Sequence, residues 1–269
     1  MKIHAVPVRD DNYAYILQSS EDGKAVFVDP FDVAAVSGAA EKLGIAKEQV
    51  VGLLTTHHHF DHSGGNEAFT TAYPGRPVFG GSDQIPALTQ KVRDADELND
   101  LLPGISIKCL ATPCHTQDHI CYHVSSASSG KQGVFTGDTL FISGCGRFFE
   151  GTPQEMLTAM DKLSTLPDPT LVYCGHEYTK ANAEFSAAIL PRDEHAISTL
   201  VNNLKQGQKC TTGVYTIADE KSHNPFMRCR DAAVKEKVEK LSGETAGDEV
   251  AVMRLLRELK NAGKVKANI

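Results

Sequence analysis

One stretch decides the fold, Thr55-Thr56-His57-His58-His59-Phe60-Asp61-His62-Ser63-Gly64-Gly65. The aliphatic run 50–54 before it predicts a short buried strand, and residues 66–70 after it predict the start of a helix. The histidines and the aspartate therefore belong at the carboxyl end of a strand, where an α/β sheet opens its binding crevice. Because imidazole and carboxylate are ligands of zinc, iron and manganese, the stretch predicts a metal site rather than a solvated histidine-rich loop.

Three further motifs follow short apolar runs downstream, and each carries residues that can bind a metal. They are Thr112-Pro113-Cys114-His115-Thr116, Phe135-Thr136-Gly137-Asp138-Thr139-Leu140-Phe141 and Leu171-Val172-Tyr173-Cys174-Gly175-His176-Glu177-Tyr178. With His57-x-His59-x-Asp61-His62, they resemble in type and order the signature of the metallo-β-lactamase fold family. The resemblance implies an α/β fold, a four-layer αβ/βα sandwich with its ligands at strand ends.

Composition limits the classes of function. The chain has 269 residues, 41% of them hydrophobic, and a formal net charge of −7. This acidic balance argues against a nucleic-acid partner, which usually leaves a basic footprint, and no apolar run is long enough to predict a membrane span. Residues 1–12 have neither signal-peptide nor transit-peptide character. We therefore expect a cytoplasmic, monomeric protein without a membrane partner.

The seven cysteines predict neither a disulfide framework nor a zinc ribbon, because their number is odd and no C-x-x-C pair occurs. Reduced thiols are the simplest interpretation. Cys114 and Cys174 stand beside candidate ligands, and a ligand role for them stays open. We rank it below a structural role, because His115 and His176 already complete the pattern.

The pattern changes after Tyr178, where β-branched runs give way to apolar residues at helical spacing. Helices are expected over residues 181–190, 193–206, 228–241 and 248–262. We therefore place a domain boundary near Lys180, with a metallo-β-lactamase-like catalytic domain at 1–180 and a small all-helical, substrate-binding domain at 181–269. Within the first domain, residues 33–43 and 152–166 predict helices, and the polar segment 85–100 predicts surface helix and loop.

Other motifs bring the resemblance closer to one family. They are Asp11-Asn12-Tyr13, Gly144-Cys145-Gly146-Arg147-Phe148-Phe149-Glu150-Gly151, Asn224-Pro225-Phe226-Met227-Arg228 and Met253-Arg254-Leu255-Leu256-Arg257-Glu258-Leu259-Lys260. Together with the strand-end motifs, they resemble the glyoxalase II family, the hydroxyacylglutathione hydrolases, over nearly the full length. That resemblance implies a thioester hydrolase that cleaves S-D-lactoylglutathione and related S-2-hydroxyacylglutathiones to a 2-hydroxy acid and glutathione.

The same resemblance implies two divalent transition-metal ions, zinc first, with iron or manganese as alternatives. His57, His59 and His115 would hold one ion, and Asp61, His62 and His176 the other. Asp138 would bridge them. Asp61 and Asp138 count as catalytic, because a hydroxide that bridges the ions would be the nucleophile.

Substrate contacts are also carried over from the family. Glutathione is anionic, so cations are needed, and the family nominates Arg147, Arg257 and Lys260, with Phe149 and Tyr178 beside them. Phe149 departs from the usual tyrosine and lacks a hydroxyl that would contact glutathione. Asp118 departs from a usual glycine, which leads us to expect a positive φ there.

Several alternatives stay open. Asp29 either orients a ligating histidine or caps a turn, and His58 is expected to point away from the metals. His119 is expected to be a buried, hydrogen-bonded histidine. Rival functions are a persulfide dioxygenase, another hydrolase of the same fold such as a lactonase or ribonuclease, and a non-catalytic metal-binding protein.

Overall fold

A computed structural model describes residues 1–191 and 195–269, and these form two compact units. Unit 1 comprises Met1–Thr112, Asp118–Gly137 and Tyr173–His176. Unit 2 comprises Pro113–Gln117, Asp138–Val172 and Glu177–Ile269. In the part of the chain that the structure describes, no helix is both long and apolar enough to cross a membrane.

The first sheet of unit 1 has the strand order β1-β2-β3-β4-β5-β6. Its strands are β1 (Lys2–Val8), β2 (Asn12–Gln18), β3 (Ala25–Val28), β4 (Val50–Leu54), β5 (Val78–Gly80) and β6 (Gln90–Lys91). Strands β1 to β3 pair antiparallel, whereas β3, β4, β5 and β6 run parallel. The carboxyl ends of β3 and β4 therefore meet at one edge, and the histidine-rich stretch begins there.

The second sheet has the order β12-β9-β8-β7. Its strands are β7 (Ser106–Ala111), β8 (Ile120–Ser125), β9 (Gln132–Gly137) and β12 (Leu171–Cys174). Aromatic side chains join it to the first sheet: the rings of Tyr15 and Phe135 are 5.2 Å apart, and Tyr122 donates a hydrogen bond to the carbonyl of Thr55. The core of unit 1 lies partly between these two sheets.

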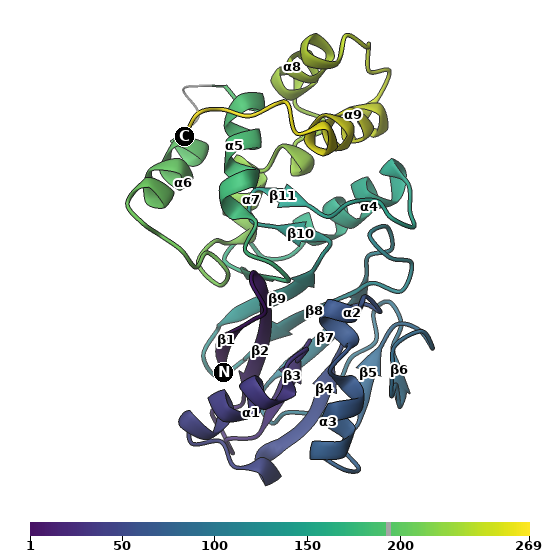
Figure 1. Ribbon diagram of the computed structural model, residues 1–269, viewed down its shortest axis with the longest axis vertical. Coiled ribbons are helices and arrows are strands. Elements are labelled where there is room, and N and C mark those ends of the chain that lie inside the picture. The colour runs from purple at the N-terminus through teal and green to yellow at the C-terminus, as the bar shows by residue number, and fades with distance from the viewer. Residues whose placement is uncertain (192–194) are drawn as a thin grey trace. The chain divides into compact units, whose positions relative to one another are not determined.

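Helices complete unit 1 (Figure 1). They are α1 (Val33–Lys42), the 3-10 turn η1 (Lys47–Gln49), α2 (Phe60–Ser63) and α3 (Asn66–Ala72). The carboxylate of Asp32 caps the start of α1, and Gly44 follows its end with φ +77°, a conformation that glycine adopts without strain. The aromatic rings of Phe69 and Tyr73 pack on Phe27 of β3, which fixes α3 to the sheet.

Unit 2 is mainly helical and carries a small ribbon of β10 (Leu140–Phe141) and β11 (Gly144–Cys145). Its helices are α4 (Pro153–Ser164), α5 (Thr179–Ile189), α6 (His195–Lys205), α7 (Ile217–His223), η2 (Pro225–Met227), α8 (Ala232–Ser242) and α9 (Glu249–Ala262). Helix α4 begins as expected, because Thr152 and Glu155 form a capping box around Pro153. Helix α9 packs against both α4 and α8.

One expectation about secondary structure is wrong, and one helix is absent from the expectations. Residues 85–100 contain no helix, because their backbone groups bond instead to neighbouring strands: Val92 donates to Gly80, and Leu98 donates to Ile107. Helix α7 was not expected, although Thr216 and Asp219 form a capping box at its start. The expected start of a helix at Asp193 lies outside the described residues.

Candidate metal and substrate site

Asp29 organises the edge of the sheet from which the ligand candidates emerge. It follows β3 with φ +46°, a strained conformation, and it is buried. Its carboxylate accepts hydrogen bonds from the backbone and hydroxyl of Thr56, at 2.8 and 2.6 Å, and from Nδ1 of His62 at 2.9 Å. Of the two roles left open for Asp29, the structure therefore favours the first: Asp29 orients His62 and does not merely cap a turn.

Asp61, His62 and His176 form a cluster in which every ligand atom is an acceptor. Nδ1 of His62 faces Asp29, and Nδ1 of His176 faces Asp11 at 2.9 Å. A carboxylate only accepts, so each neutral ring carries its proton on Nδ1 and leaves a lone pair on Nε2. The two Nε2 atoms are 3.3 Å apart, and that of His176 is 3.4 Å from Asp61. These atoms repel one another unless a cation lies among them, so the donor set fits a metal ion.

Asp11 and Asn12 complete this cluster, and the sequence analysis assigned them no role. The side-chain amide of Asn12 donates to the carboxylate of Asp61 at 3.1 Å, which holds that oxygen beside His176. The backbone of Tyr13 bonds to Gly175, so the start of β2 and the end of β12 are joined. Asp11 lies in the turn after β1 and Asn12 is the first residue of β2; their motif contributes to the family resemblance, but nothing in the local pattern predicts these contacts. Only the pairing between distant segments reveals their function.

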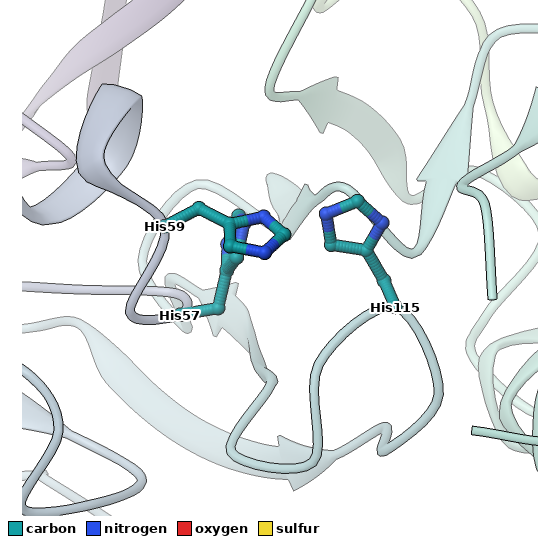
Figure 2. Close-up of side chains that lie close together, drawn as sticks. All are labelled: His57, His59 and His115. Carbon is teal, nitrogen blue, oxygen red and sulfur yellow. The ribbon is translucent and has the colours of Figure 1, made fainter. Parts of the chain in front are cut away.

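His57 and His59 leave the segment between β4 and α2 (Figure 2), and their ring centroids are 4.9 Å apart. The hydroxyl of Thr56 donates its single proton to Asp29, so it accepts from Nδ1 of His57, 3.0 Å away. This bond leaves the lone pair of His57 on Nε2. The ring of His57 is fully buried and lies 4.3 Å from that of His62. In unit 1 the structure therefore gathers five predicted ligands around one strand end.

The expectation of a positive φ at Asp118 is wrong, because the residue lies outside the left-handed region. Its nearly buried carboxylate instead faces Nδ1 of His58 at 2.9 Å and accepts from the hydroxyl of Ser82 at 3.0 Å. The function of Asp118 therefore lies in its side chain, which pairs with His58. His58 was expected not to be a metal ligand, and this contact agrees with that expectation. His119 is fully buried, with Nδ1 3.0 Å from the hydroxyl of Thr112, as predicted.

His115 and Asp138 come together within unit 2. Nδ1 of His115 donates to the backbone carbonyl of Arg147 at 3.0 Å, so Nε2 carries the lone pair. That Nε2 is 3.4 Å from the carboxylate of Asp138. Gly146 permits this approach, because a Cβ atom there would lie 1.9 Å from the carbonyl oxygen of Asp138. Nε2 of His115 and the carboxylate of Asp138 are both acceptors and face each other, so a cation between them would be favourable.

A cavity of about 380 Å³ in unit 2 contains this pair and all five predicted substrate-binding residues. Its lining includes Arg147, Phe149, Tyr178, Arg257 and Lys260. The ring of Phe149 is exposed and lies 5.2 Å from that of His115. All five side chains that the sequence nominates for substrate contact therefore line one cavity.

Two of the three Arg and Lys side chains that line the cavity lie on α9. Arg257 is buried, stacks over Phe226 and donates to the carbonyl of Cys145 at 3.0 Å. Lys260 donates to the carbonyl of Ala181, and its ammonium lies over the ring of Phe185. Burial, helped by the charge of Arg257, lowers the pKa of Lys260 to about 8. Neither residue has an ion pair in the described part of the chain, so the cavity favours an anionic ligand.

The cysteines beside the ligands have structural contacts. Cys114 is buried and donates to the carbonyl of Thr152, and burial raises the pKa of its thiol. Cys174 donates to the carbonyl of His176 at 3.3 Å. All seven cysteines are free. These contacts favour the structural role for both residues over a ligand role.

The chain matches two family models. The metallo-β-lactamase superfamily model covers residues 8–176, and the model of the hydroxyacylglutathione hydrolase C-terminus covers residues 177–263. Similar solved structures include a Staphylococcus aureus metallo-β-lactamase, with a TM-score of 0.60 and 19% identity over 91% of this chain and 68% of that one. Another is the BLEG-1 B3 metallo-β-lactamase, with a TM-score of 0.57 and 21% identity over 84% of this chain and 99% of that one. These confirm the expected metallo-β-lactamase fold.

Named relatives are closer in sequence. A probable hydroxyacylglutathione hydrolase of Schizosaccharomyces pombe is 42% identical over 97% of this chain and 100% of its own length. The cytoplasmic hydroxyacylglutathione hydrolase of Arabidopsis thaliana is 42% identical over 88% and 92%. The mitochondrial hydroxyacylglutathione hydrolase of Saccharomyces cerevisiae is 37% identical over 93% and 91%. The chain belongs to the hydroxyacylglutathione hydrolase, or glyoxalase II, family of the metallo-β-lactamase superfamily.

Proposed function

We propose that this protein hydrolyses S-D-lactoylglutathione and related S-2-hydroxyacylglutathiones to a 2-hydroxy acid and glutathione. The observation that carries the proposal is the match over nearly the whole chain to relatives named for this reaction. The C-terminal family model adds support, because it covers the helices that carry the cavity's cations. The protein is thus an enzyme, a thioester hydrolase.

The proposed metal ligands are the seven residues named from the sequence. His57, His59 and His115 are assigned to one ion, Asp61, His62 and His176 to the other, and Asp138 to both. The superfamily model spans all seven residues. In four of the histidines, the hydrogen bond at Nδ1 selects the tautomer with a free lone pair on Nε2: His57, His62, His115 and His176. The donors are imidazoles and carboxylates, which suit divalent transition metals. We expect zinc first, with iron or manganese as alternatives.

The ions, when bound, would lower the pKa of coordinated water towards neutrality and polarise the thioester carbonyl. The protein's own contribution is to hold the ligands. Asp29 and Asp11 fix the rings of His62 and His176, and Asn12 fixes the carboxylate of Asp61. A thiolate leaving group has a pKa of about 8.5, so it departs with little help from an acid. No protein nucleophile is required.

The cavity in unit 2 is proposed as the glutathione subsite. Arg257 and Lys260 supply buried and partly buried cations for the carboxylates of glutathione, and Arg147 adds a third. Tyr178 is proposed to donate a hydrogen bond, and Phe149 to make an apolar contact at the rim. A division into a catalytic domain at 1–180 and a helical substrate-binding domain at 181–269 agrees with the family models, which meet between residues 176 and 177.

The test follows hydrolysis of S-D-lactoylglutathione by its thioester absorbance, with Asp138→Ala beside the unaltered enzyme. We expect Asp138→Ala to abolish turnover. Asp168→Ala is the control, because Asp168 forms an exposed ion pair with Lys221 and should be neutral. Oxygen consumption with glutathione persulfide, without thioester hydrolysis, would instead establish a persulfide dioxygenase. Metal binding without either activity would indicate a non-catalytic protein.

We also propose that the protein is a cytoplasmic monomer with a small-molecule substrate. The Arabidopsis relative, named as cytoplasmic, supports this location, whereas the name of the Saccharomyces relative makes mitochondria the alternative. Sedimentation analysis tests the monomer, and fractionation of the native cells tests the location.

A further inference from the structure

The turn that joins β10 to β11 has a strained backbone that surrounding side chains hold in place. Ser143 has φ +58°, in the left-handed region, although it is not a glycine and is fully buried. Such a conformation is unfavourable for a residue other than glycine and persists only where neighbouring groups enforce it. Gly144, the next residue, has no room for a side chain, because a Cβ atom would lie 2.6 Å from Asn182.

Helix α7 and its C-cap hold the turn from one direction. The carboxyl group of Glu220 accepts from the backbone N–H of Ser143 at 2.9 Å and from the side-chain amide of Asn224 at 2.8 Å. Asn224 also donates to the carbonyl of Gly144 at 3.0 Å. Glu220 and Asn224 are fully buried, so water cannot replace these bonds.

Two side chains of helix α5 hold the same turn by donating hydrogen bonds to the turn's carbonyl groups. Asn182 donates to the carbonyl of Ile142 at 3.1 Å, and Ser186 donates to the carbonyl of Ser143 at 2.9 Å. Both side chains are buried. Besides the pairing of β10 with β11, side chains of α5, of α7 and of its C-cap Asn224 therefore hold the turn, so these helices help to set its conformation.

The clamped turn lies between two candidate functional residues. Asp138 precedes β10, and Arg147 follows β11. The N–H of Gly146 returns to the carbonyl of Thr139 at 3.2 Å, which closes the ribbon, and the carbonyl of Arg147 accepts from Nδ1 of His115. A shift of the turn would therefore move Asp138, Arg147 and the ring of His115 together.

We propose that Glu220 is a positioning residue that, by clamping Ser143, holds Asp138 and His115 in the geometry that metal binding requires. The inference rests on the proposed function and extends it. The C-terminal helices then support two metal ligands as well as binding the substrate. Groups hydrogen-bonded directly to metal ligands typically contribute about 10–100-fold to metal affinity or activity, and we expect Glu220, which acts on the ligands through the turn, to contribute within that range.

The test compares Glu220→Ala with Glu220→Gln. One oxygen of Glu220 accepts both bonds, and the amide oxygen of glutamine can take its place; burial also raises the pKa of Glu220 to about 8, which favours the neutral form. We expect Glu220→Ala to weaken zinc affinity about 10–100-fold in competition with a chelator. The amide of Ser143 should also exchange its hydrogen faster in the metal-free protein. Glu220→Gln should restore both values.

Val238→Ala is the control, because Val238 is fully buried in α8 and makes none of the turn's hydrogen bonds. It should lower the melting temperature and leave zinc affinity unchanged. Equal losses of zinc affinity in Glu220→Ala and Val238→Ala would overturn the proposal, as would wild-type affinity in Glu220→Ala. If Glu220→Ala does not fold, Ser186→Ala, which removes one bond to Ser143, must weaken zinc affinity or the proposal fails.

The two proposals fail in different ways. Zinc affinity and amide exchange are measured without substrate, so they test the clamp even in a protein that hydrolyses no thioester. Thioester hydrolysis by the unaltered enzyme, together with wild-type zinc affinity in Glu220→Ala, would leave the function intact and remove only the clamp.

Discussion

The Nε2 atoms of His62 and His176 lie 3.3 Å apart, and on the opposite side of each ring the Nδ1–H donates a hydrogen bond to a carboxylate. Two lone pairs at this distance are unfavourable without a cation. The carboxylates of Asp29 and Asp11 therefore act through the histidines, because they select the tautomer that can bind metal.

Asp29→Asn should weaken metal binding about 10–100-fold, because an amide cannot accept from Thr56 and His62 at once without turning an N–H towards a donor. Competition with a chelator measures the change. Asp32→Asn is the control, since Asp32 only caps α1. Equal metal affinity in the two variants would show that Asp29 does not orient the site.

Arg257→Ala should raise KM for S-D-lactoylglutathione about 10–100-fold and change kcat little, because it removes a charged hydrogen-bond donor worth about 1.5–3 kcal/mol. Steady-state kinetics measures both constants. Arg254→Ala provides a control on the same helix, since Arg254 is more exposed and pairs with Glu244 and Glu258. An unchanged KM in Arg257→Ala would refute the substrate assignment of α9.

Substrate affinity should depend on the charge of Lys260. Its pKa is lowered to about 8 by burial, so the side chain is charged below pH 8 and loses its charge above it. We therefore expect KM to rise as the pH increases from about 7 to 9. In Lys260→Arg, whose guanidinium stays charged, KM should be flat over this range. The same rise in both enzymes would assign the pH dependence to another group.

Phe149→Tyr should lower KM. The new hydroxyl would restore a contact to glutathione worth about 0.5–1.5 kcal/mol, a factor of about 2–13. Because Phe149 is exposed at the rim of the cavity, the larger side chain can be accommodated without repacking. An unchanged KM would mean that this position does not contact the substrate backbone.

The sequence places several of the proposed ligands directly after an apolar strand, because the local pattern is enough to predict such a position. His57 follows β4 and His176 follows β12, whereas His62 lies one step further on, in α2. Residues that act through a distant partner are not predictable in this way. Asp11 is an ordinary turn residue until β12 brings His176 beside it.

The remaining errors have similar causes. The positive φ expected at Asp118 rests on the family's usual glycine at this position, but the residue instead bonds to His58 and Ser82 through its side chain. Residues 85–100 were expected to contain a helix because they are polar, whereas their backbone extends along neighbouring strands. In both segments, hydrogen bonds to residues distant in the sequence determine the conformation. The pattern of a single sequence does not reveal such bonds.

The most direct test of the central claim is elemental analysis of the purified, active enzyme, paired with thioester hydrolysis before and after chelation. We expect about two transition-metal ions per chain. Chelation should abolish hydrolysis, and added zinc, iron or manganese should restore it. An enzyme that hydrolyses S-D-lactoylglutathione at full rate with no bound transition metal would contradict the account.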